Sequence, residues 1–365
     1  MSPADIVDTA EDAAAQDRQP LIVRRPLEAF LDGHGLGEGE IEAERIGEGH
    51  SNLTFLIRRG GEEFVLRRPP RPPLPPSAHD VLREARVLRA IEATEARVPE
   101  VLLTSEDGEH GEDILGVPFY LMPYIEGEVI TTTVPGPLDS PPEREAIAHE
   151  LIDALVEVHA IDPFEHGLEG FGKPTGYLER QLRRFTGLWE HNRTREVPEI
   201  EQTTEWLQRN LPESPPATIV HGDFRLGNAM YAPEAPARLL ALFDWELSTI
   251  GDPLADVGYL TATYAQHDDP ENLFTQTLSQ VTALEGFPSR DELVARYEER
   301  TGRSIADLRW YQALALWKSA VFLEGNYKRF VQGASDDEFY RLMERGIPEL
   351  ARAALEVTRQ PAPRT

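Results

Sequence analysis

The pattern of apolar residues changes near residues 124–130, and this change constrains the fold more than any other feature of the chain. Before it, apolar residues form short strand-like runs bounded by glycine and proline. After it, they follow the spacing of long amphipathic helices. The sequence therefore predicts an α+β protein with two lobes, a β-rich one at residues 21–124 and a mainly helical one at residues 125–365.

The β-rich lobe is expected to be a small antiparallel sheet that carries one helix. Gly60-Gly61 lies between two β-rich runs and is typical of a hairpin turn. Six of the eight residues from Pro69 to Pro76 are proline, which excludes both helix and central strand there and predicts an extended connector. The predicted strands cover residues 42–46, 53–58, 63–67, 98–103 and 118–124, and the predicted helix has its apolar face between Val81 and Ile91.

Composition excludes several classes of protein. The chain has no cysteine, which rules out disulfides and cysteine-ligated metals, and no apolar run of the ~20 residues that a membrane span needs. Its net charge of −28 disfavours nucleic acid and anionic membranes as partners. Residues 1–20 are acidic, rich in alanine and unlike a secretory signal, so we expect a disordered tail on a cytoplasmic protein.

Two polar clusters follow short apolar runs in the second lobe. The first runs from His221 to Asn228 and includes Asp223, and the second is Phe243-Asp244-Trp245. Carboxylate and amide oxygens are the ligands that Mg²⁺ prefers, and a second aspartate is then available to face a substrate hydroxyl. A capped turn, in which Asp and Asn bond to the backbone, is the structural alternative.

A glycine-containing turn joins the first two predicted strands. Its residues Gly47, Gly49, Ser51 and Asn52 could bring backbone and side-chain donors close to phosphate oxygens. A strand rather than a helix follows the turn, so it is not the dinucleotide fingerprint, and it lacks the Gly-Lys-Ser/Thr step of a Walker loop. A plain hairpin turn is the alternative.

The third predicted strand offers an apolar residue and a cation on one face. Val65 and Arg67 point the same way, as a nucleotide base and its phosphates would require, and Glu84 on the following helix could pair with Arg67. The chain has no lysine before Lys173, so an arginine must supply any phosphate-binding cation in the first lobe. A surface-exposed strand arginine is the alternative.

The last strand of the first lobe suggests an adenine-binding hinge. Pro123 lacks an N–H but offers its carbonyl oxygen, and Ile125, two residues further on, offers an N–H. Met122 would line the pocket with an adaptable side chain. An edge strand that leads into a linker would have the same sequence.

The order of these motifs resembles that of the aminoglycoside phosphotransferase and choline kinase-like family, which shares the protein-kinase-like fold. The resemblance runs from about Ile41 to Tyr259. Two stretches, Leu66–Pro70 and Asp244–Asp256, are similar to the kinase domains that are fused to acyl-CoA dehydrogenases.

The resemblance implies roles for individual residues. Asp223 would be the catalytic base, and Asn228 and Asp244 would be the Mg²⁺ ligands. The glycine turn would cover the phosphates of ATP. Arg67 stands where kinases of this fold usually have lysine, so the charge is kept but not the geometry of a compact ammonium.

These features predict an ATP- and Mg²⁺-dependent phosphotransferase that acts on a hydroxyl of a small molecule, possibly a hydroxyacyl thioester. Only eleven residues separate Asp244 from Asp256, too few for the long activation segment of a protein kinase. An aminoglycoside or amino-alcohol kinase is the alternative within this class. A nucleotide-binding regulatory module without turnover, or a metal-dependent hydrolase, would be an alternative of another class.

Overall fold

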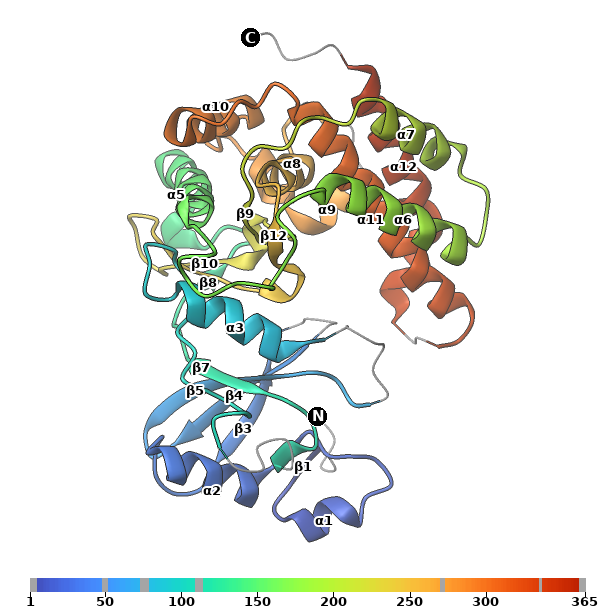
Figure 1. Ribbon diagram of the computed structural model, residues 1–365. Coiled ribbons are helices and arrows are strands. Elements are labelled where there is room, and N and C mark those ends of the chain that lie inside the picture. The colour runs from blue at the N-terminus through green and yellow to red at the C-terminus, as the bar shows by residue number, and fades with distance from the viewer. Residues whose placement is uncertain are drawn as a thin grey trace. The chain divides into compact units, whose positions relative to one another are not determined.

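The computed structural model describes residues 5–47, 52–72, 79–108, 114–269, 273–334 and 337–360, which form two compact units (Figure 1). The first unit comprises Met1–Thr94, Val98–Glu126 and Asp244–Glu246. The second comprises Glu95–Arg97, Gly127–Phe243 and Leu247–Thr365. The chain therefore contributes Glu95–Arg97 to the second unit, passes into it again after Glu126, and returns briefly to the first at Asp244.

A five-stranded antiparallel sheet forms the centre of the first unit. Its strand order is β3-β4-β5-β7-β6, and Gly60 and Gly61, with φ of 59° and 85°, make the two-residue turn between β4 and β5. Glycine adopts these positive φ values without a Cβ clash. The strands are β3 (Glu42–Ile46), β4 (Leu53–Arg59), β5 (Glu62–Arg68), β6 (Leu103–Thr104) and β7 (Tyr120–Pro123).

Alternation along the strands gives this sheet two different faces. Phe55 and Phe64 point to one face and pack with Phe30 of α2 (Arg24–His34) in the main apolar core of the unit. Arg67 points to the other face, where α3 (Val81–Ile91) presents Glu84 to it. Figure 1 shows the two helices on opposite sides of the sheet. The predicted helix and hairpin are confirmed.

Two expectations for the first unit are wrong. Within the expected disordered tail, β1 (Ile6–Val7) pairs in parallel with β2 (Ile22–Val23), and α1 (Ala10–Ala14) lies between them. Of the strand expected at residues 98–103, only Leu103 belongs to a strand. Pro99 has no N–H for a ladder, and the N–H of Val101 donates to the Glu92 carboxylate instead.

The second unit consists mainly of helices around α11 (Leu308–Val331), against which α6, α8 and α12 pack. No described helix has the length and the apolar character that a membrane span requires. The other α-helices are α5 (Pro141–Ala160), α6 (Tyr177–Asn192), α7 (Pro198–Arg209), α8 (Leu254–Thr263), α9 (Leu273–Leu278), α10 (Arg290–Thr301) and α12 (Met343–Arg359).

Short antiparallel strands position the polar clusters of the second unit. Strand β9 (Thr218–Val220) pairs with β12 (Thr249–Gly251) and ends directly before His221. Strand β10 (Ala229–Tyr231) lies between β8 (Glu128–Val129) and β11 (Leu239–Leu242), and β11 ends directly before Phe243. Both predicted clusters therefore follow strands, as the sequence indicated.

Candidate active site

The glycine turn belongs to the first unit and is described at its two ends. Gly47 follows β3 with φ of 74°, and Asn52 precedes β4 with only 3% of its surface exposed. The Asn52 side-chain amide donates to the Glu246 carboxylate at 3.1 Å, while its Oδ1 has no hydrogen-bond partner among the described residues. Gly49 and Ser51, predicted to cover phosphates, lie outside the described residues.

Arg67 is held by two carboxylates within the first unit. Its Nε donates to Glu84 Oε2 at 2.8 Å, and its Nη2 donates to Asp244 Oδ1 at 2.7 Å. The side chain of Glu84 is 1% exposed and that of Asp244 is 32% exposed. The predicted pairing of Arg67 with Glu84 is confirmed, and Arg67 is not an exposed strand arginine.

Glu84 is the centre of a buried polar network. It accepts hydrogen bonds from the backbone N–H of Trp245 at 3.2 Å and from the Tyr120 hydroxyl. Burial raises the pKa of Glu84, although the charge of Arg67 acts in the opposite direction. Burial also opposes the charge of Arg67, but the nearby carboxylates outweigh it and raise the Arg67 pKa. Tyr120 is a member of this site that the sequence did not suggest.

Asp244 has an unusual backbone conformation. Its φ is 65°, in the left-handed region, where asparagine and aspartate are the non-glycine residues found most often. This turn directs the Asp244 carboxylate to Arg67 immediately after β11 ends. The predicted metal ligand therefore occupies a specialised backbone position.

Arg68 has a structural role. It points to the core face of the sheet, is 0% exposed, and donates to the carbonyl oxygens of Leu21 and Pro69. Burial lowers its pKa to about 10, and the nearby charge of Arg71 adds to this effect. The two neighbouring arginines thus serve opposite faces of the sheet, one a functional candidate and the other part of the core.

The predicted hinge residues continue the face on which Arg67 lies. Val65 pairs in register with Met122, and both side chains are buried. The carbonyl oxygens of Phe119 and Leu121 accept hydrogen bonds on the edge of β7 that faces β6. Because carbonyl directions alternate along a strand, the Pro123 carbonyl points to that same edge, beyond the end of β6. Ile125 follows the strand and is half-buried.

Asp223 lies in the second unit, in a loop directly after β9. Its side chain is 20% exposed, and its Oδ2 accepts a hydrogen bond from Asn228 Nδ2 at 2.8 Å. Arg225 Nε lies 3.5 Å from the same oxygen. Because the Asn228 amide nitrogen bonds to Asp223, its oxygen is the atom left to face a cation.

A buried carboxylate holds this loop by its backbone. Asp256, on α8, accepts the N–H groups of His221 and Gly222 at 2.7 and 2.8 Å. Its Oδ2 also lies 3.3 Å from His159 Nε2, and His159 Nδ1 lies 2.8 Å from the Tyr297 hydroxyl. His159 and Tyr297 come from α5 and α10, so no local sequence pattern connects them with the loop.

Further bonds fix the two ends of the loop. His221 Nε2 lies 2.9 Å from the Phe243 carbonyl oxygen, so His221 braces the loop, as expected. The Phe243 N–H donates to the Asn228 carbonyl oxygen at 2.8 Å, one residue before Asp244. Gly222 has φ of 88°, and a Cβ there would lie 2.7 Å from the Leu247 carbonyl oxygen, so the loop requires glycine at this position.

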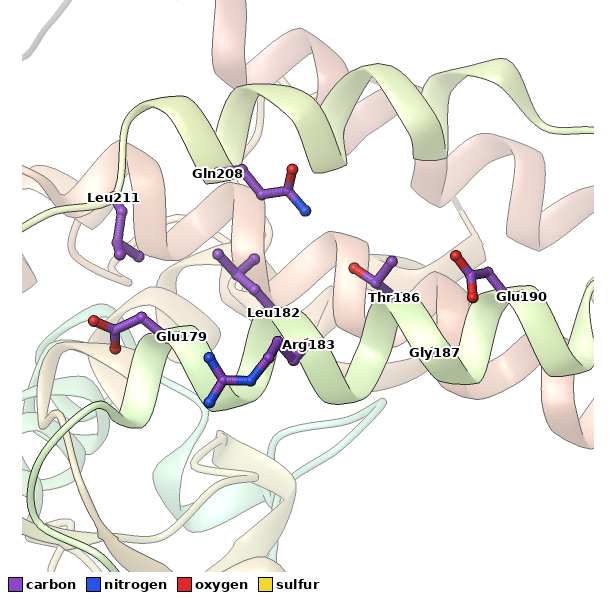
Figure 2. Close-up of a pocket in the computed structure, with 8 residues that line it drawn as sticks. All are labelled: Glu179, Leu182, Arg183, Thr186, Gly187, Glu190, Gln208 and Leu211. Carbon is purple, nitrogen blue, oxygen red and sulfur yellow. The ribbon is translucent and has the colours of Figure 1, made fainter.

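A groove of about 530 Å³ opens elsewhere in the second unit, between α6 and α7. Figure 2 shows Leu182 and Thr186 rising from α6 toward α7, from which Gln208 reaches back. Of the residues predicted for catalysis, nucleotide binding or metal binding, none that the structure describes lines this groove.

The fold and these loops are those of a kinase-like phosphotransferase. A crystal structure of a candidate aminoglycoside phosphotransferase from Ralstonia eutropha matches with a TM-score of 0.78 and 31% identity, covering 92% of this chain and 97% of that one. A complex of aminoglycoside phosphotransferase APH(4)-Ia with AMP-PNP and hygromycin B matches with a TM-score of 0.57 and 18% identity, covering 91% and 98%.

The chain belongs to the phosphotransferase enzyme family, whose model matches residues 42–314. Acyl-CoA dehydrogenase family member 11 of Rattus norvegicus is 32% identical over 92% of this chain and 43% of that protein. Acyl-CoA dehydrogenase family member 10 of Mus musculus is 36% identical over 84% and 28%. The chain thus spans less than half the length of these curated relatives.

These findings confirm the predicted family, its acyl-CoA dehydrogenase-associated branch and the predicted fold class. As a member of this family, the chain is a phosphotransferase of the small-molecule kinase class, and the related APH(4)-Ia binds the ATP analogue AMP-PNP.

Proposed function

We propose that the protein transfers the γ-phosphoryl group of ATP to a hydroxyl group of an acyl thioester. The observation that carries the choice of acceptor is the 32% identity with an acyl-CoA dehydrogenase family member, which extends over 92% of the chain. A hydroxylated acyl thioester is an acceptor whose acyl part a dehydrogenase of that family could also bind.

The donor atoms of the predicted site fit the two cofactors. The Asn228 amide oxygen and the Asp244 carboxylate are the hard oxygen ligands that Mg²⁺ prefers, and we assign them to the metal. Arg67 has the charge for phosphate oxygens, and the glycine turn, including Gly49 and Ser51, would cover them. When bound, ATP supplies the phosphoryl group and Mg²⁺ offsets the negative charge of the phosphates.

Asp223 is the proposed catalytic base. Its carboxylate would take the proton of the acceptor hydroxyl as that oxygen bonds to the γ-phosphorus and ADP leaves with the electrons of the broken P–O bond. The hydrogen bond from Asn228 and the neighbouring Arg225 fix the orientation of the carboxylate. The hydrogen bonds that the loop backbone donates to the Asp256 carboxylate would hold Asp223 in position, and Asp256 itself would not contact the substrate.

The adenine would lie against Val65 and Met122. The Pro123 carbonyl is the proposed acceptor for the adenine amino group, and the Ile125 N–H the proposed donor to a ring nitrogen. Glu84 would act through Arg67, because it bonds to that guanidinium rather than to the nucleotide.

The test is ATP consumption with Mg²⁺ against a panel of acceptors, with Asp223→Asn as the inactive control. Hydroxyacyl thioesters should be phosphorylated, and the same thioesters without the hydroxyl should give only the background rate. Phosphorylation of aminoglycosides or amino alcohols, with none of the thioesters, would overturn the proposed acceptor but leave the enzyme class intact.

Antibiotic phosphorylation is a second candidate because of the fold shared with the hygromycin B complex and the net charge of −28, which attracts polycations.

A further inference from the structure

Two cations lie against one aromatic ring in the second unit. Lys318 Nζ, from α11, is 4.9 Å from the centre of the Phe185 ring. Arg184 Cζ, from α6, is 5.9 Å from the same centre. The Phe185 ring also contacts Trp317, at 6.2 Å between ring centres, which fixes its position. Both positive charges therefore contact the same ring, and the charge of Arg184 acts on that of Lys318.

Neither cation has a carboxylate partner among the described residues, unlike most arginines of this unit. Arg195 pairs with Glu324 and Arg296 pairs with Asp153, for example. Lys318 is half-buried, and burial together with the charge of Arg184 lowers its pKa to about 8. A partly buried ammonium without a counter-ion is unfavourable, and a bound anion would remove the deficit.

Lys318 lies within electrostatic range of the carboxylate that holds the Asp223 loop. The Asp256 carboxylate, which holds the backbone of His221 and Gly222, acts on the Lys318 charge and partly offsets the lowering of its pKa. At the start of α6, the Tyr177 ring packs on Gly251, where an added Cβ would lie 2.5 Å from it. Helix α6 thereby packs against β12, the strand that pairs with β9 before the loop.

We propose that Lys318 and Arg184 form an anion-binding subsite for the acceptor, which therefore carries a carboxylate or a phosphate in addition to its hydroxyl. In a chain with a net charge of −28, such an anion would be repelled from most of the surface and held only where cations lack partners. The substrate assignment rests on the proposed function, whereas anion binding by itself does not.

Lysine-selective NMR tests anion binding without turnover. The chain has only three lysines, Lys173, Lys318 and Lys328, so ¹³Cε labelling gives three signals that single substitutions can assign. We expect the Lys318 signal to shift saturably with inorganic phosphate or with acetate, in contrast to sodium chloride at equal ionic strength. Equal small shifts of all three signals would overturn the subsite.

Acceptor kinetics test the substrate class and separate the two sources of charge. One arm compares 4-hydroxybutyrate with 1,4-butanediol, and the other compares a hydroxyacyl-CoA with the same acyl group on uncharged N-acetylcysteamine. Lys318→Met and Arg184→Met should each raise KM for the charged member about tenfold and leave the neutral member nearly unchanged. The arm that responds identifies carboxylate or carrier phosphate as the anion.

Matched controls exclude a purely structural role. Lys173 is exposed, and Arg183 lines the groove between α6 and α7, so Lys173→Met and Arg183→Met should leave both KM values unchanged. Lys318→Arg should restore most of the preference for the charged acceptor. Equal losses on charged and neutral acceptors would overturn the proposal. If no acceptor is phosphorylated, the proposed function fails, and the NMR shifts still decide whether the subsite exists.

Discussion

The two halves of the predicted site are held in different ways. In the first unit, Arg67 is positioned by side-chain ion pairs with Glu84 and Asp244. In the second, the loop of Asp223 is positioned by its backbone, through the bonds of His221 and Gly222 to Asp256. Side-chain ion pairs can exchange partners when phosphates and a metal arrive, whereas the backbone bonds need not change. The comparison suggests an adjustable nucleotide end and a fixed catalytic loop.

The largest expected effect tests the fixed loop. We expect Asp223→Asn to lower kcat by roughly 10²- to 10⁴-fold, because a general base is lost while the shape of the side chain is kept. Calorimetric titration with AMP-PNP should give a Kd close to that of the wild type. An equal loss of nucleotide affinity would place Asp223 among the nucleotide or metal ligands instead.

Nucleotide binding at Arg67 should depend on the positive charge of the side chain more than on its shape. We expect Arg67→Ala to weaken nucleotide binding by about 10- to 100-fold, as expected for charge-assisted hydrogen bonds worth ~1.5–3 kcal/mol. Arg67→Lys should retain measurable turnover, because the ammonium keeps the charge although the planar fork is lost.

Arg67→Ala also leaves Glu84 buried without its partner, so Arg67→Ala/Glu84→Gln is the matched control for stability. If the double variant regained nucleotide affinity, Arg67 would act on the fold of the unit rather than on phosphates.

Substitution of the neighbouring Arg68 should lower stability and leave nucleotide binding unchanged. Arg68→Met removes the donor to the Leu21 and Pro69 carbonyls, so we expect a loss of about 1–3 kcal/mol in the free energy of unfolding. The KM for ATP should stay the same, and urea denaturation measures the stability. A raised KM with unchanged stability would mean that the two faces of the sheet are assigned wrongly.

The smallest expected effect is the pH dependence of folding stability that arises from His159, which contacts the Asp256 carboxylate behind the loop. Burial lowers the pKa of His159 from the ordinary value of 6.5, so the unfolded chain binds a proton more readily than the folded one. Stability is therefore complete above pH 6.5 and falls as the pH drops below it, by about 1.4 kcal/mol per unit of pKa difference. His159→Gln should remove this part of the pH dependence; parallel stability curves for the two proteins would contradict it.

The sequence predicted those strands whose bounds are set by interactions between residues close together in the chain. Strand β3 has the predicted bounds, and β4 and β5 differ from the prediction by one residue at their ends, because alternation and Gly60-Gly61 fix that hairpin. The pairing of Ile6–Val7 with Ile22–Val23 was missed, because each run is too short to form a strand alone.

The contacts of the candidate site also differ in whether the sequence could predict them. Arg67 and Glu84 could be paired from the sequence because strand and helix periodicity place both on one face. The contacts of Tyr120 with Glu84 and of His159 with Asp256 join residues that are 36 and 97 positions apart, and only the folded chain brings them together. Strand alternation predicts that Arg67 and Arg68 point to opposite faces of the sheet. It does not predict that Arg68 is fully buried, which only the structure shows.

The left-handed backbone at Asp244 limits which replacements can test the role of its carboxylate. Asparagine tolerates this conformation, so Asp244→Asn removes the negative charge with little conformational cost. Alanine or a β-branched residue would also disturb the turn, and its effect would mix chemistry with geometry. Aspartate, asparagine and glycine are therefore among the residues that fit this turn at the least conformational cost, and of these three only aspartate brings an anionic ligand.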